Sequence, residues 1–151
     1  MKQALTLILL GAIFVAGSAY AADPIVGTWK LNVAKSKFSP GPAPQAGTRV
    51  YTESAGLYTL DQKITGADGK ENSLQAQYRN GQDVKDPGGE ASTSAKKVDA
   101  NTWNFDIKMD GKVVGHVHRV VSADGKMLTV HNTGRQGDAA ATDDTMVFDK
   151  Q

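Results

Sequence analysis

The chain has 151 residues, with 17 Lys and Arg against 16 Asp and Glu, and it contains no Cys. The near balance of charge argues against a nucleic acid or an anionic membrane surface as the main partner. The absence of Cys excludes disulfides and a Cys nucleophile. The 16 glycines and the few helix-like stretches are typical of an all-β protein rich in turns.

Residues 1–21 have the pattern of a secretory signal peptide. Lys2 supplies the positive end, residues 5–17 are apolar, and Ala19-Tyr20-Ala21 is a small-residue cleavage site. The apolar run is shorter than the roughly 20 residues of a membrane-spanning helix, so we expect cleavage after Ala21 rather than a signal anchor. The remaining chain, residues 22–151, is then a single domain, and we expect it in the periplasm or outside the cell, with no stable membrane span.

Alternation of apolar and polar residues predicts a series of short strands along residues 22–151. The first contains Trp29, Leu31 and Val33, and a proline-rich loop over residues 34–47 follows it. A second loop is expected over residues 134–143. The other strands are expected at residues 48–53, 57–65, 70–79, near Val84, at 94–98, in three runs within 101–131, and at 145–150.

The three runs within residues 101–131 are separated by Asp110-Gly111 and Asp124-Gly125. An Asp-Gly pair between alternating runs is a strong hairpin signal, so this stretch is predicted to be an antiparallel meander. We expect a three-residue turn over residues 109–111, which pairs Ile107 with Val113. We expect a four-residue turn over residues 123–126, which pairs Val121 with Leu128.

Nine or ten strands with short connections and no convincing helix are expected in total. A single sheet of this size curls or splits, and closure into a barrel removes its edges. We therefore predict an all-β fold, a single antiparallel up-and-down β-barrel in which the first and last strands meet. A two-sheet sandwich is the alternative.

The stretch Gly27-Thr28-Trp29-Lys30-Leu31 resembles the Gly-x-Trp opening of the calycins, which include the lipocalins and the fatty-acid-binding proteins. Residues 109–112, Arg119, residues 124–128 and residues 145–150 resemble the last four strands of a fatty-acid-binding protein. The run from residue 27 to residue 44 is also similar to that of uncharacterised secreted bacterial proteins, which brings no activity with it. The resemblance implies a calycin-like barrel with an interior ligand cavity.

Two features depart from the fatty-acid-binding pattern. The proline-rich segment stands where that family has a helix-turn-helix lid. Met146 and Phe148 stand where its last strand has the Arg and Tyr that hold a ligand carboxylate, whereas Arg119 falls close to its other interior Arg. The resemblance therefore implies an apolar interior more strongly than a carboxylate site.

The first functional hypothesis is a binding protein for a small, mostly apolar molecule held inside the barrel. Arg119 lies on the predicted inner face, where a buried charge needs a partner. That partner is either an anionic group of the ligand or, as the calycin resemblance implies, the structural Trp29. The expected ligand-binding residues are Tyr58, Tyr78, Phe105, Arg119, Met146 and Phe148.

The second hypothesis is a zinc protein or zinc hydrolase. His116 and His118 are two residues apart on one strand, and the predicted register places His118 opposite His131 on the polar face. Three His ligands with an open fourth position are typical of catalytic zinc. The third hypothesis is a filled barrel with a structural or protein-interaction role. No Gly-x-Ser-x-Gly or phosphate-loop pattern favours an enzyme of another kind.

Overall fold

Ten antiparallel strands in one sheet make up the part of the chain that the computed structural model describes, residues 22–134 and 141–151. The predicted signal peptide and residues 135–140 of the predicted last loop lie outside the described residues. The only helical element in the described ranges is one 3-10 turn, Val33–Lys35. The strands are β1 Gly27–Leu31, β2 Ala46–Ser54, β3 Leu57–Thr65, β4 Glu71–Tyr78, β5 Asp83–Lys85, β6 Ala91–Lys97, β7 Thr102–Met109, β8 Lys112–Val121, β9 Met127–Gly134 and β10 Thr142–Lys150.

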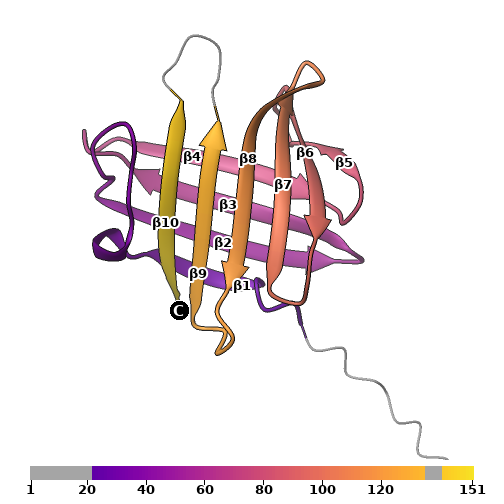
Figure 1. Cartoon of the computed structure of the whole chain (residues 1–151), viewed down its shortest axis with the longest axis horizontal. Helices are drawn as coiled ribbons and strands as arrows, with labels where there is room; N and C mark the ends of the chain where they lie inside the picture. Colours follow the sequence, from indigo (N-terminus) through magenta and orange to yellow (C-terminus); the bar gives the residue numbers. More distant parts are fainter. Residues whose placement is uncertain (1–21, 135–140) are drawn as a thin grey trace, which may run out of the picture.

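The sheet curls into a near-closed barrel. Its strand order is β4-β3-β2-β1-β10-β9-β8-β7-β6-β5, so β1 pairs with β10 and the two free edges are β4 and β5. In Figure 1 the strands β1 to β4 form one layer, and β7 to β10 cross in front of them. The continuity of one sheet confirms the predicted calycin-like barrel, with the first and last strands in contact, rather than a sandwich.

The two Asp-Gly turns of the meander differ in how well their sequence predicted the register. The second pairs Val121 with Leu128, as predicted. At the first, the predicted pairing of Ile107 with Val113 is wrong, because Ile107 lies opposite Gly115. The turn consists of Asp110 and Gly111 alone, with φ of 49° and 74°, the positive values that two-residue hairpin turns require. The shorter turn shifts the pairing by one residue and a bulge between Ile107 and Lys108 shifts it by one more, and Val113 is 47% exposed.

Aromatic side chains fill the half of the barrel nearest the β2–β3 and β6–β7 connections. Tyr58 stacks on Tyr78 with ring centroids 5.1 Å apart, and Trp103 and Phe105 meet the Tyr78 ring edge-on at 5.3 and 4.9 Å. Each such pair contributes about 0.5–1.5 kcal/mol beyond its buried area. This half of the interior is therefore packed protein core.

The chain before β1 is fastened to the same half of the barrel. Asp23, whose side chain is 5% exposed, accepts hydrogen bonds from Lys97 Nζ at 2.5 Å and from the Tyr58 hydroxyl at 3.0 Å. The indole nitrogen of the buried Trp29 donates to the carbonyl of Ile25 at 2.8 Å. Within the described residues, no helix has the length and apolar character needed to cross a membrane.

Candidate ligand cavity in the barrel interior

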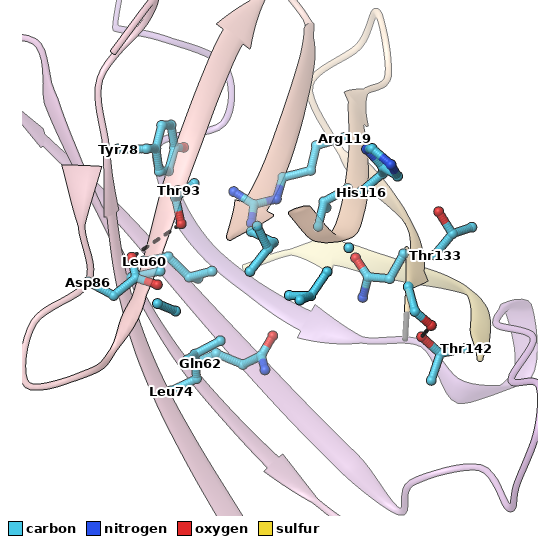
Figure 2. A pocket seen from close by; sticks show the side chains of 18 of the residues that line it. Leu60, Gln62, Leu74, Tyr78, Asp86, Thr93, His116, Arg119, Thr133 and Thr142 are labelled. Carbon is cyan, nitrogen blue, oxygen red and sulfur yellow. Dashed lines mark hydrogen bonds between the residues drawn. The ribbon is translucent and has the colours of Figure 1, made fainter. Parts of the chain in front are cut away.

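The other half of the barrel, towards the β3–β4 and β7–β8 turns, contains a cavity of about 470 Å³. Volumes of about 300–1,000 Å³ are typical of small-molecule sites. Most of the lining is apolar, and the polar side chains project into it from several strands (Figure 2). The apolar part is formed mainly by Leu60, Leu74, Ala76, Ala91, Ile107, Val114, Val117 and Met146.

Arg119, on β8, presents an unpartnered cation to this cavity. The residue is 6% exposed, and its guanidinium carbon lies 4.0 Å from the Phe105 ring centroid, with Tyr51 and Tyr78 also within 5.6 Å. Its Nε and Nη1 are buried and have no hydrogen-bond partner in the described residues. Leaving a buried donor unpaired costs about 1–3 kcal/mol, and more when the group is charged. Aromatic faces offset part of this cost, but they do not replace a hydrogen-bond acceptor.

Arg49, on β2, is a second buried cation in the lining, at 4% exposure. Its Nε donates to Gln62 Oε1 at 2.7 Å and its Nη1 to the Tyr51 hydroxyl at 3.2 Å, while Phe148 packs against it at 4.8 Å. Burial lowers the pKa of this guanidinium, and the positive charge of Arg119 lowers it further. Both arginines thus contribute positive potential to one cavity, but among the described residues only Arg49 has protein acceptors for its Nε and Nη1.

The predicted ligand-binding residues divide into lining and supporting positions. Tyr78, Arg119 and Met146 line the cavity. Phe105 and Phe148 are outside the lining and pack against the two arginines. Tyr58 is also outside it, bound to Asp23, and burial together with that carboxylate raises the pKa of Tyr58 to about 12. The Tyr78 hydroxyl has no partner in the described residues, and burial raises its pKa, so it remains a neutral donor.

The sequence did not predict seven polar residues of the lining: Arg49, Gln62, Asp86, Thr93, Asn132, Thr133 and Thr142. Arg49 had a signal, since it is two residues from Tyr51 and therefore shares its face of β2. Asp86 had none, because it follows the short strand β5 in a stretch that reads as loop.

Of the two partners considered for Arg119, the one that the calycin resemblance implied, Trp29, is not in contact with an arginine side chain among the described residues. Lys150 Nζ lies 5.0 Å from the Trp29 ring, whereas Arg119 packs on Phe105. Trp29 itself is fully buried in the core, in keeping with a structural role.

The three histidines lie on the polar face, where His116 also borders the cavity, and His118 is opposite His131 as predicted. Each ring already bonds to a different neighbour: His116 Nδ1 to Asp106 Oδ1 at 2.7 Å, His118 Nδ1 to Asn104 Oδ1 at 2.6 Å, and His131 Nε2 to Asp143 Oδ1 at 2.6 Å. Across residues 22–134 and 141–151, no group of three His, Asp or Glu side chains is placed to hold a metal ion. The described arrangement therefore gives the zinc hypothesis no geometric support.

Comparison with known proteins gives no match to any protein-family model and no sequence match to a curated protein. Solved structures do match. The REP1-NXSQ fatty acid transporter has a TM-score of 0.54 at 15% identity, covering 86% of this chain and 98% of its own. The Schistosoma mansoni fatty acid binding protein in complex with arachidonic acid has a TM-score of 0.53 at 13% identity, covering 85% of this chain and 96% of its own.

The zebrafish ileal bile acid-binding protein complexed with cholic acid has a TM-score of 0.55 at 9% identity, covering 85% of this chain and 99% of its own. At such identities the likeness concerns the fold, and it extends over nearly the whole length of each structure. The chain therefore has the calycin-like barrel fold of the fatty-acid-binding proteins.

Proposed function

We propose that this protein is an exported carrier of a small, mostly apolar molecule that bears one anionic group, held in the barrel cavity with the anion against Arg119. The observation that supports it most is the buried guanidinium of Arg119, whose Nε and Nη1 lack an acceptor in the described residues. A ligand anion would supply that acceptor.

The apolar part of the proposal rests on the lining. Apolar side chains from six strands surround the space, and burying a ligand there would be worth about 25 cal/mol for each Å² of apolar surface removed from water. The proteins of like fold are a fatty acid transporter, a fatty acid binding protein in complex with arachidonic acid and a bile acid-binding protein complexed with cholic acid, and such ligands are apolar bodies with one carboxylate. They support the ligand class and do not identify the ligand.

The anionic part rests on charge and geometry. A carboxylate at the cavity wall would accept charge-assisted hydrogen bonds from Arg119 Nε and Nη1, which are about twice as strong as neutral ones. The buried Tyr78 hydroxyl offers a further donor, and Arg49 adds positive potential without giving up its bonds to Gln62 and Tyr51. This clamp would use β2, β4 and β8 rather than β10, where Met146 and Phe148 stand.

Export rests on the signal-peptide pattern of residues 1–21. We expect the mature chain to begin at Ala22. The intact mass of the protein recovered from the periplasm or medium, after expression of the full chain, tests this: a chain still carrying residues 1–21 would contradict it.

The binding proposal is tested with dodecanoate and dodecanol, which share a chain and differ in charge. Calorimetric titration of the delipidated mature protein should show dodecanoate binding at least about tenfold more tightly, since about 1.4 kcal/mol corresponds to tenfold. Arg119→Met should remove this preference. Arg79→Met is the matched control, because Arg79 bonds to the carbonyl of Ala55 outside the cavity. This variant should keep the preference for dodecanoate. Failure of the wild type to bind either probe, or a preference that survives in Arg119→Met, would contradict the proposal.

A further inference from the structure

A buried carboxylate in the cavity wall has no part in the proposed anion site. Asp86 follows β5 directly, is 9% exposed and lines the cavity. It is the acidic residue of a lining whose other full charges, Arg49 and Arg119, are positive. Buried Asp is rare unless the carboxylate is paired or hydrogen-bonded, so each oxygen of Asp86 is expected to have a hydrogen-bond donor.

One oxygen of the Asp86 carboxylate has two hydrogen-bond donors within the protein. Oδ1 accepts hydrogen bonds from the backbone N–H of Gln77 in β4 and from the Thr93 hydroxyl in β6, both at 3.2 Å. These donors come from the two sides of the gap that separates the free edge strands β4 and β5, and together they fix the carboxylate in place. Figure 2 shows Asp86 joined to Thr93 at the cavity wall.

The other oxygen, Oδ2, receives no hydrogen bond from any described residue. Arg119 does not supply one, since no ion pair joins the two and the Arg119 Nε and Nη1 are themselves unpartnered. The apolar Leu60, Ala76 and Ala91 also line this cavity. Burial raises the pKa of Asp86, while the Gln77 N–H, the Thr93 hydroxyl and the charge of Arg119 act in the opposite direction.

We propose that Asp86 Oδ2 is a second polar subsite that accepts a hydrogen bond from a hydroxyl group of the ligand, so that the carried molecule is a hydroxylated apolar anion rather than a plain one. This inference rests on the proposed function, because it takes the ligand to lie in the same cavity. The anionic group would face Arg119 and the hydroxyl would face Asp86, which sets the orientation of the ligand as well as its class.

An unsubstituted hydrocarbon chain would pack unfavourably against Asp86 Oδ2. Methylene groups against Oδ2 would exclude water without replacing it, which costs about 1–3 kcal/mol for an unpaired buried acceptor. A hydroxyl removes that cost. Sites built to bond a ligand hydroxyl discriminate strongly against the analogue that lacks it.

The test compares dodecanoate with its monohydroxy isomers, which carry the hydroxyl at successive carbons, by calorimetric titration of the mature protein. At least one isomer should bind about tenfold more tightly than dodecanoate, and its O-methyl ether, which cannot donate, should lose that gain. Asp86→Leu should abolish the preference. Asp61→Leu is the matched control and should retain it, because Asp61 is exposed, bonds to Gln75 and does not line the cavity.

The outcomes separate the two proposals. Failure of the wild type to bind every probe would overturn the proposed function. Binding of all isomers no more tightly than dodecanoate would overturn the Asp86 subsite alone, as would a gain that the methyl ether keeps. The comparison of alcohol and ether needs only the wild-type protein, so it decides the matter even if Asp86→Leu fails to fold.

Discussion

Arg119 and Arg49 are both buried in one cavity wall, but their hydrogen bonding differs. Arg49 donates to Gln62 and Tyr51, whereas Nε and Nη1 of Arg119 have no acceptor in the described chain. Arg119→Met should therefore raise the free energy of unfolding of the ligand-free protein by about 1 kcal/mol, because an unpaired buried charge is replaced by an apolar side chain of similar length.

Arg49→Met is the matched variant, and it should lower the free energy of unfolding by about 1–3 kcal/mol because it removes two made hydrogen bonds. Chemical denaturation of the delipidated proteins measures both. Equal destabilisation by the two substitutions would show that Arg119 has a protein partner and is not held ready for a ligand.

Asp86 gives a pH-dependent prediction at the same scale. Burial raises its pKa above the ordinary 3.8, so the native state holds the proton to higher pH than the unfolded state does. The stability of the wild type should then fall, relative to Asp86→Asn, as pH rises from about 3.8 through the native pKa. Denaturation at a series of pH values measures the difference between the two proteins.

Asp99→Asn is the control of opposite sign for this pH series. Hydrogen bonds from Asn101 and Thr102 lower the pKa of Asp99, so its contribution is present above pH 3.8 and is lost as pH falls through the native pKa. The two variants should therefore diverge from the wild type in opposite directions with pH. Parallel behaviour would contradict the account of Asp86.

The sequence predicted single site residues only where a side chain follows strand alternation. Arg119 and Tyr78 lie on inner faces that their own strands define, and both line the cavity. Asp86 was not predictable, because a three-residue strand gives no alternation and its donors, Gln77 and Thr93, come from elsewhere in the chain. The absence of a partner for Arg119 was equally hidden, since it depends on side chains from several strands.

At the scale of elements, the contact between β8 and β9 is set by Gly134. A Cβ added there would lie 2.6 Å from the carbonyl oxygen of Val114 and 2.7 Å from the Cα of Gly115. Both atoms belong to backbone, so the strands would have to separate. Gly134→Ala should destabilise the protein by about 1–3 kcal/mol, the usual range for overpacking.

Gly89→Ala is the control for this substitution, since its nearest contact would be an ordinary 3.8 Å. Thermal and chemical unfolding of both variants, compared with the wild type, measure the effect. A Gly134 variant as stable as the Gly89 variant would mean that β8 and β9 do not approach this closely.

The meander shows which structural features the alternation of apolar and polar residues predicts and which it does not. The pairing of β7 with β8 differs from the predicted one by two residues, one from the shorter turn and one from the bulge. Because the side-chain period is also two, the predicted faces hold, and Trp103 and Phe105 are buried. The bulge beside Ile107 was not predictable, because the sequence around Asp110-Gly111 suits a turn of two or three residues equally.

At the scale of the whole molecule, the barrel divides into a packed half and a hollow half. The curling of one long sheet into a barrel followed from the number of strands, so the architecture was predictable from the pattern, although β4 and β5 remain as free edges. The cavity was not predictable, since the same two strands, β3 and β7, supply Tyr58, Trp103 and Phe105 to the filled half and the smaller Leu60 and Ile107 to the cavity.

Filling the cavity with the proposed ligand should stabilise the whole barrel. At a free concentration about 100-fold above the dissociation constant, dodecanoate should add about 2.7 kcal/mol to the free energy of unfolding, because it binds only the folded state. Denaturation with and without dodecanoate measures this, and dodecanol at the same concentration is the control, with a smaller effect expected. Equal stabilisation by both would argue against an anion site.

The central claim is that the anionic group of the ligand contacts Arg119 inside the barrel. The most direct measurement is the ¹³C NMR titration of dodecanoate labelled at its carboxyl carbon and bound to the mature protein. An adjacent arginine lowers a carboxyl pKa by about 1–3 units, so the bound carboxyl should stay ionised well below the pH at which free dodecanoate is protonated. Arg119→Met should abolish this lowering. A bound carboxyl that titrates as it does in water, or that is indifferent to Arg119→Met, would contradict the claim and place the anion outside the barrel.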